Sequence, residues 1–134
     1  RCMASEELAA IADYQHHFDV IYASEVIEHV SDIKAFTETI AQLLAPDGVV
    51  VITTINRTMP ALLFAKFAAE YVLKIVPAGT HQFEKFVRPA ELRAVFQECG
   101  ILIDDVTGFV PTPMGTFKMS PITAVNYGAA GSFT

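Results

Sequence analysis

FDVIYASEVIEHV, residues 18–30, is the strongest indication of the fold of this chain. Its first half is apolar, with β-branched and aromatic side chains at Val20, Ile21 and Tyr22, which is typical of a strand buried on both faces of a parallel sheet. Ionisable groups follow directly where that strand should end. In open α/β sheets, ligands bind in the crevice beyond the carboxyl ends of the strands. The stretch therefore predicts a functional site immediately after a buried strand.

The ionisable groups of this stretch are Glu25, Glu28 and His29, which follow Ser24. If residues 25–30 form one helical turn, the two carboxylates and the imidazole stand at positions i, i+3 and i+4 and share one face. Carboxylates are hard oxygen ligands of the kind that Mg²⁺ prefers. An imidazole is also suited to act as a general base near neutral pH. A turn that serves the structure alone is the alternative interpretation.

The elements that follow predict a strand–helix–strand unit. Residues 33–44 carry apolar side chains at helical spacing, with Ser31 or Asp32 as the N-cap and a turn at residues 46–48 as the end. Residues 49–55, VVVITTI, are almost purely β-branched and predict a second buried strand. This order implies a right-handed parallel crossover.

The last third of the chain predicts one more helix and two more strands. Pro89 is suited to the first position of a helix that Gly100 closes. Residues 101–110 and 118–129 have the composition of strands. Because the turn at residues 111–115 leaves no room for a helix, the last strand should pair antiparallel as a hairpin.

Composition narrows the class of protein. The chain has 134 residues, enough for one domain, and a net charge of −6 with scattered basic residues, which excludes nucleic acid as an expected partner. Cys2 and Cys99 have no metal-ligand spacing and suit a reducing, intracellular compartment. Because the sequence begins at Arg1 in mid-pattern, followed by a short helix that Ser5 should cap, we expect it to be a piece of a longer protein.

One segment is more apolar than its neighbours. It begins at Met59 and ends at Val76, and its only charges are Lys66, Glu70 and Lys74, spaced by four in a narrow stripe. The remaining apolar surface exceeds what one sheet face would bury, so an extra apolar partner is implied. That partner is a core neighbour, an apolar substrate under a lid, or the membrane interface.

Three motifs and a closing tripeptide carry a resemblance to a known family. They are ASEVIEHV at 23–30, ITTINRT at 52–58, AEYVLKIVPAGTHQFEKFVRPAEL at 69–92 and VNY at 125–127. Over nearly the whole chain, these are similar to the class I S-adenosylmethionine-dependent O-methyltransferases of ubiquinone biosynthesis. The resemblance implies an α/β fold, the C-terminal half of a Rossmann-like methyltransferase. Its sheet would be mostly parallel, with a terminal antiparallel β-hairpin and an inserted apolar helix.

The resemblance also implies an activity and its residues. Family members methylate polyprenyl catechol-type intermediates and demethylubiquinol, with S-adenosylmethionine as the methyl donor. By resemblance, Glu25, Glu28 and His29 hold Mg²⁺, and Ser24 lies beside the cofactor. A metal ion next to a catechol oxygen lowers the pKa of the phenol and fixes its orientation. His29 and His81 are the candidate catalytic bases.

The chain departs from the full-length family in two places. Residues 1–134 form a single partial domain, because the glycine-rich cofactor loop and the acidic residue that holds the ribose would lie upstream of Arg1. We therefore expect this fragment alone to bind S-adenosylmethionine poorly and to be inactive. VPTPMG at 110–115 replaces a Tyr-Asn-Pro-like turn. Asn56 and Arg57 are expected to contact the substrate head group or to shape their loop.

A polyprenyl substrate places the expected enzyme at a membrane. We predict peripheral attachment to the inner membrane through residues 59–76, on the cytoplasmic face in bacteria or the matrix face in mitochondria, with a quinone-biosynthesis protein complex as a further partner. Two alternatives remain. One is a metal-independent class I methyltransferase acting on another small acceptor, and the other is a non-catalytic module that binds membrane or protein.

Overall fold

The computed structural model describes residues 2–58, 85–112 and 116–134, with only the backbone at Pro111. Its elements are α1 (Ser5–Ala9), η1 (Ala12–Tyr14), β1 (Phe18–Ser24), α2 (Ile33–Leu43), β2 (Leu44–Ile55), α4 (Pro89–Glu98), β3 (Ile101–Pro111), β4 (Phe117–Ser120) and β5 (Asn126–Phe133). The predicted apolar segment 59–76 and His81 lie outside the described residues.

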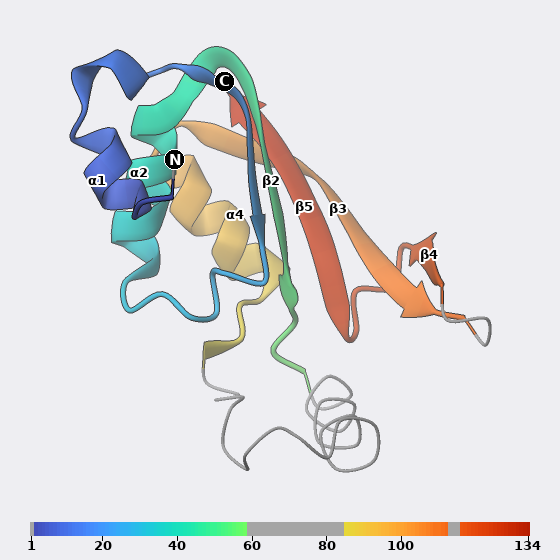
Figure 1. Cartoon of the computed structure of the whole chain (residues 1–134). Coiled ribbons are helices and arrows are strands. Elements are labelled where there is room, and N and C mark those ends of the chain that lie inside the picture. The colour runs from blue at the N-terminus through green and yellow to red at the C-terminus, as the bar shows by residue number, and fades with distance from the viewer. Residues whose placement is uncertain (1, 59–84, 113–115) are drawn as a thin grey trace.

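The strands form one sheet in the order β1-β2-β5-β3-β4. As predicted, β1 and β2 pair parallel, and α2 lies between them in the chain. Helices α1, α2 and α4 lie on one side of the sheet in Figure 1. No described helix covers the other face in Figure 1. Val20 and Tyr22 of β1 are 64% and 63% exposed there, so the predicted burial of this strand on both faces is wrong for the described residues.

The C-terminal strands differ from the prediction in their number and order. The predicted strand 118–129 is two strands, a short β4 and a longer β5, and β5 pairs antiparallel with both β2 and β3. Small residues at 128–131, GAAG, let β5 fit between two neighbours. A Cβ at Gly131 would lie 2.3 Å from the carbonyl oxygen of Leu102. Close approach of the backbones therefore requires glycine there.

Strand β2 starts earlier than predicted. Residues 46–48, which we expected to form a turn before the strand, lie within β2. The register of β1 against β2 is irregular here: Phe18 pairs with Leu44, and Val20 then pairs with Val49. The extra residues on β2 form a bulge, and the sequence signal for a turn reflects this bulge.

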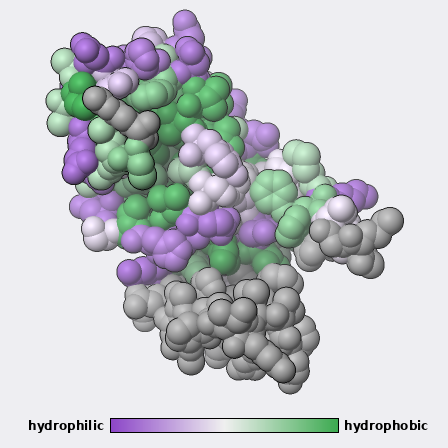
Figure 2. Space-filling model, viewed as in Figure 1, coloured by the Kyte–Doolittle hydropathy of each residue, from purple (hydrophilic) through white to green (hydrophobic). Residues whose placement is uncertain are grey.

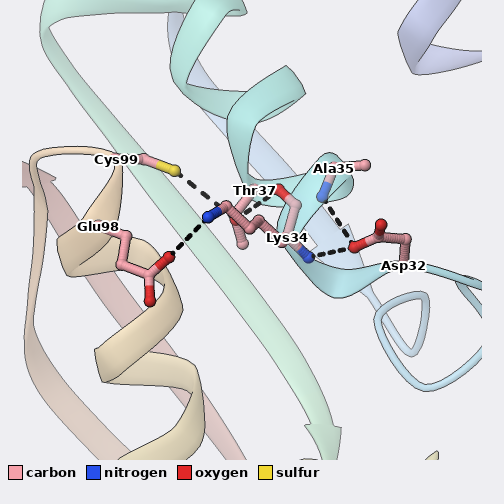
Figure 3. A network of polar contacts seen from close by, with 6 residues as sticks. All are labelled: Asp32, Lys34, Ala35, Thr37, Glu98 and Cys99. Atoms are coloured by element: carbon pink, nitrogen blue, oxygen red, sulfur yellow. Dashed lines mark hydrogen bonds and ion pairs between the residues drawn. The ribbon is translucent and has the colours of Figure 1, made fainter.

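Helix caps agree with the sequence in one case and not in the other. Asp32 caps α2, since its Oδ1 accepts hydrogen bonds from the backbone N of Lys34 at 2.9 Å and Ala35 at 3.1 Å (Figure 3). The predicted Ser5 cap is wrong: Ala4 occupies the N-cap position, and the Ser5 hydroxyl donates to the adjacent Glu6. Because α1 has only five residues, a serine at its start was a weak basis for predicting which residue is the N-cap.

Two contacts join α2 to the end of α4 (Figure 3). Lys34 Nζ lies 3.2 Å from Glu98 Oε2, and the Cys99 thiol donates to Thr37 Oγ1 over 3.7 Å. Gly100 follows with φ +79°, as expected for the glycine that closes a helix. Cys99 is half-buried at this junction.

The core lies between the sheet and these helices. It includes Phe36, Ile40, Leu92 and Phe96 from the helices and Val50, Ile52, Ile101 and Tyr127 from the strands. The buried Tyr127 hydroxyl donates to the carbonyl of Val87 at 3.0 Å, which satisfies the one polar group of that ring. Burial and nearby carboxylates raise the pKa of Tyr127.

Candidate active site

The acidic turn, residues 24–29, leaves β1 by a sharp bend. Glu25 has φ +52°, in the left-handed region, and its backbone N donates to the carbonyl of Thr53 at 2.8 Å. The His29 backbone N then donates to the carbonyl of Val26 at 2.9 Å. A regular helical turn over residues 25–30 is therefore a wrong prediction, because the parallel partner β2 still holds Glu25 after β1 has ended.

The two carboxylates of the turn nevertheless meet. Glu28 is only 4% exposed, and its Oε2 accepts a hydrogen bond from Thr54 Oγ1 at 2.7 Å. The Glu25 side chain is hydrogen-bonded to Glu28. Ser24 Oγ lies 2.9 Å from Thr53 Oγ1. Thus β2 supplies one threonine to each end of the turn.

This arrangement favours a proton between the carboxylates. Partial burial, followed by the charge of Glu28 and the hydrogen bond with it, raises the pKa of Glu25 to about 7, while a hydrogen bond with Thr53 acts in the opposite direction. Two carboxylates this close ionise together only at a cost, which a shared proton or a cation relieves. The pair therefore fits a hard divalent cation such as Mg²⁺, which is commonly held by one or two carboxylates and water.

His29 does not join the pair. Its side chain is exposed, and the described residues contain no group of three or more His, Cys, Asp or Glu side chains placed to hold a metal ion. The structure thus brings Glu25 and Glu28 together and leaves His29 apart. Metal binding by all three residues stays a prediction, as does catalysis by His29, and His81 is not described.

A cavity of about 400 Å³ lies beside the acidic turn. Its apolar lining is Ile27, Val30, Ile33, Phe86 and Val87, and its polar lining is Ser31, Arg57, Lys85 and Glu91. Apolar walls with a few polar groups are typical of sites for small organic ligands. Arg57 is ion-paired with Glu91 at this cavity, so it connects β2 to the start of α4.

The other residue expected to face substrate, Asn56, has a buried structural role. It is 6% exposed, its Nδ2 donates to the carbonyl of Thr123 at 2.7 Å, and its backbone N donates to Val125 O at 2.8 Å. Asn56 Oδ1 has no hydrogen-bond partner among the described residues. For Asn56, the structure supports the loop-shaping alternative.

Sequence reasoning missed Thr53 and Thr54 as site residues. Both stand in the VVVITTI strand, where threonine is expected for its β-branched shape alone. Their position could have indicated a role in the site, because both threonines stand at the carboxyl end of a strand that is parallel to β1. Their partners, Ser24, Glu25 and Glu28, become evident only when the register of β1 against β2 is known.

The strand order and the acidic turn after β1 define a class I methyltransferase fold. The chain belongs to the family described as methyltransferase domain, which matches residues 3–104. A SAM-dependent methyltransferase from Thermotoga maritima has the same fold, with a TM-score of 0.67 at 12% identity over 95% of this chain and 61% of its own. Magnesium protoporphyrin IX methyltransferase from Synechocystis, solved with bound SAH, gives a TM-score of 0.58 at 15% identity over 95% and 48%. The predicted methyltransferase fold is confirmed, with one difference: the described sheet is mixed, with one parallel and three antiparallel strand pairs, and not mostly parallel.

Curated relatives make the similarity more specific. A protein from Rhizobium etli named ubiquinone biosynthesis O-methyltransferase is 42% identical over 128 residues, which are 95% of this chain and 50% of that protein. Others with the same name range from 38% to 46% identity. The chain spans about half the length of the curated relatives it matches. The resemblance to this group is confirmed.

Within the described residues, no helix is both long and apolar enough to cross a membrane.

Proposed function

We propose that this chain forms the C-terminal part of an S-adenosylmethionine-dependent O-methyltransferase of ubiquinone biosynthesis, acting on polyprenyl catechol-type intermediates and demethylubiquinol. The observation that carries the proposal is the 42% identity to proteins of that name over 95% of the chain. The methyltransferase fold and the acid pair at the carboxyl edge of the sheet, of which Glu28 is buried, support it.

In this proposal, the acid pair serves the acceptor. When bound, Mg²⁺ would lower the pKa of a catechol hydroxyl and fix its orientation. Glu25 and Glu28 would hold the ion, because their carboxylates already share one location and gain from a positive charge between them. Thr54 holds Glu28 in place through a hydrogen bond of 2.7 Å, and Ser24, whose hydroxyl lies 2.9 Å from that of Thr53, would lie beside the cofactor.

Methyl transfer also needs a proton acceptor. The acceptor hydroxyl loses its proton as its oxygen takes the methyl group from the sulfonium, which leaves as a thioether. His29 is exposed to solvent at the end of the acidic turn and is one candidate base. His81 is the other.

The substrate class carries a membrane proposal. A polyprenyl tail partitions into lipid, so an enzyme acting on it works at the membrane or covers the tail. We propose peripheral attachment to the inner membrane through residues 59–76, together with contacts to other proteins of quinone biosynthesis. The bacterial relatives favour the cytoplasmic face over the mitochondrial matrix face.

A metal-independent methyltransferase is the second candidate function. The observation that favours it is the separation of His29 from the two carboxylates, which leaves no three-residue metal cluster within residues 2–58, 85–112 and 116–134. In that case, a shared proton takes the place of the cation between Glu25 and Glu28. The acidic turn then orients substrate or only supports the strand end.

The test measures transfer of labelled methyl from S-adenosylmethionine to a prenylated catechol, by the protein expressed at the full length of its natural gene. We expect Glu28→Ala to lower kcat/KM about 100-fold or more, with calorimetric Mg²⁺ binding lost in parallel. Asp104→Ala, which removes an exposed carboxylate of β3, is the matched control and should change neither. Full activity in EDTA would refute the metal; no transfer to any catechol would refute the function.

A further inference from the structure

Apolar side chains are exposed along the hairpin of β3 and β4. Phe117 is 66% exposed, Met119 68% and Ile122 62%, and we call these three residues the hairpin patch. In Figures 1 and 2, β4 stands out from the body of the sheet, and apolar surface is visible on this arm. Large apolar side chains gathered on a projecting arm are typical of an interaction surface.

The hairpin patch lies at the functional edge of the sheet. Since β5 is antiparallel to both β2 and β3, β3 runs in the same direction as β2 and β1. β4 pairs with the last residues of β3, from Gly108 to Pro111, so it stands at the carboxyl edge, where the acidic turn also lies. Four strand spacings separate β1 from β4, roughly 19 Å.

The patch is held in a defined shape. Thr112 N donates to the carbonyl of Thr116 at 2.8 Å and closes the hairpin. The loop after β4 crosses Gly108 so closely that a Cβ there would lie 1.8 Å from the carbonyl oxygen of Ile122. Ile122 N also donates to Ser120 Oγ at 3.1 Å. Because the backbone beneath the exposed side chains is already held in one conformation, little conformational entropy is lost when a partner binds.

Charge separates this region from the rest of the chain. The whole sequence has a net charge of −6, yet residues 106–134 contain no Asp or Glu and only one charged side chain, Lys118. Lys118 is exposed and alternates with Phe117 and Met119 along β4, so it projects from the other face of that strand. A long lysine side chain beside apolar anchors suits an anionic surface that has an apolar interior.

We propose that the hairpin patch inserts into the headgroup boundary of an anionic lipid bilayer, with Lys118 at the headgroups. Interfacial binding grows with buried apolar area and with attraction to anionic lipids, and this arm supplies both. The inference rests on the proposed function, because a bilayer that holds the polyprenyl substrate would face the edge where the acidic turn opens. It proposes a second membrane contact, made by described residues, in addition to the one proposed at residues 59–76.

A second copy of the chain is a poorer occupant of this surface. Pairing through the free edge of β4 would need a longer strand, and β4 has four residues, with Lys118 inside it and Pro121 directly after it. Short edge strands with lysine and proline are protected against strand addition.

Residues 1–134 contain no tryptophan, so the emission of one introduced here is read as the difference from the parent protein. Phe117→Trp, in the full chain, places a fluorophore in the hairpin patch. Leu102→Trp is the control: it places a fluorophore at the start of β3, at the amino edge of the sheet and away from β4. With vesicles of phosphatidylglycerol and phosphatidylcholine, we expect a blue shift and quenching by brominated acyl chains at position 117 only. Equal emission with and without vesicles at position 117 would overturn the proposal.

Co-sedimentation with the same vesicles gives the size of the effect. Phe117→Ser with Met119→Ser should lower the partition coefficient about tenfold or more, because two large apolar anchors are lost. Lys118→Glu should lower binding to anionic vesicles and leave binding to neutral ones unchanged. If Phe117→Ser with Met119→Ser instead turns a dimer into a monomer and leaves vesicle binding unchanged, the patch is a self-association surface. Because vesicle binding requires no methyl transfer, this result stands apart from the activity assay.

Discussion

The acidic turn and the hairpin patch both lie at the carboxyl edge of the sheet. They depart in opposite ways from the rule that apolar side chains are buried and charged ones exposed. In the turn, Glu28 is a carboxylate with 4% exposure; in the patch, Met119 is an apolar side chain with 68% exposure. Both choices cost stability, because burying charge and exposing large apolar surface are each unfavourable. Such violations of the folding pattern are expected at functional sites.

The two regions are also supported differently. The turn is held by hydroxyl groups of the neighbouring strand, with Thr54 donating to Glu28 at 2.7 Å. The patch is held by close backbone packing, at Gly108 against the Ile122 loop. A polar site therefore depends on hydrogen-bond donors at given positions, whereas an apolar surface depends only on the shape of the backbone beneath it. This difference can be tested from both sides.

The largest expected effect comes from breaking the backbone support of the patch. Gly108→Ala places a Cβ 1.8 Å from a carbonyl oxygen, so the loop after β4 must move, and we expect a loss of about 3 kcal/mol in the free energy of unfolding. Gly100→Ala is the matched control. Its Cβ meets nothing closer than 3.9 Å, but φ is +79°, so about 1 kcal/mol is expected. Urea unfolding measures both, and equal losses would contradict the role of close approach.

The next effect comes from removing the polar support of the turn. Thr54→Val keeps the shape of the side chain and leaves the Glu28 carboxylate buried without this donor, at a cost of about 2 kcal/mol. Thr39→Val removes a buried hydroxyl that donates to the carbonyl of Ala35 within α2, and it should cost less than about 1 kcal/mol. Thr54→Ser should restore most of the loss. Failure of serine to do so would point to packing and not to the hydrogen bond.

The smallest expected effect concerns the raised pKa of Glu25 in the acidic turn. The pKa of Glu25 is about 7 in the folded chain against an ordinary 4.5, so between these values the folded state holds a proton that the unfolded state has lost. Stability should therefore fall as pH rises from 4.5 to 7 and then level off. Glu25→Gln should flatten that fall, with a gain below about 1 kcal/mol at pH 8, since the side chain keeps solvent contact. Identical pH profiles for both proteins would contradict the shared proton.

Much of the candidate site was predictable and its geometry was not. The stretch 18–30 predicts a strand followed by acids, because alternation and apolar runs act over a few neighbouring residues. The meeting of Glu25 with Glu28 was expected from helical spacing, but the structure reaches it through a left-handed bend at Glu25. The bend follows from a backbone hydrogen bond to Thr53, a residue in another strand.

The local features of this protein follow from its sequence: the strand before the acidic residues, the helix that Asp32 caps, and the helix that starts at Pro89 and ends before Gly100. Each depends on residues within about one turn of one another, where propensity and capping decide. Three further features depend on the packing of distant segments: β5 lies between β2 and β3, Thr54 donates to Glu28, and Phe117 is exposed. These outcomes depend on which distant segments become neighbours, and pairing over long separations leaves no periodic trace in the sequence.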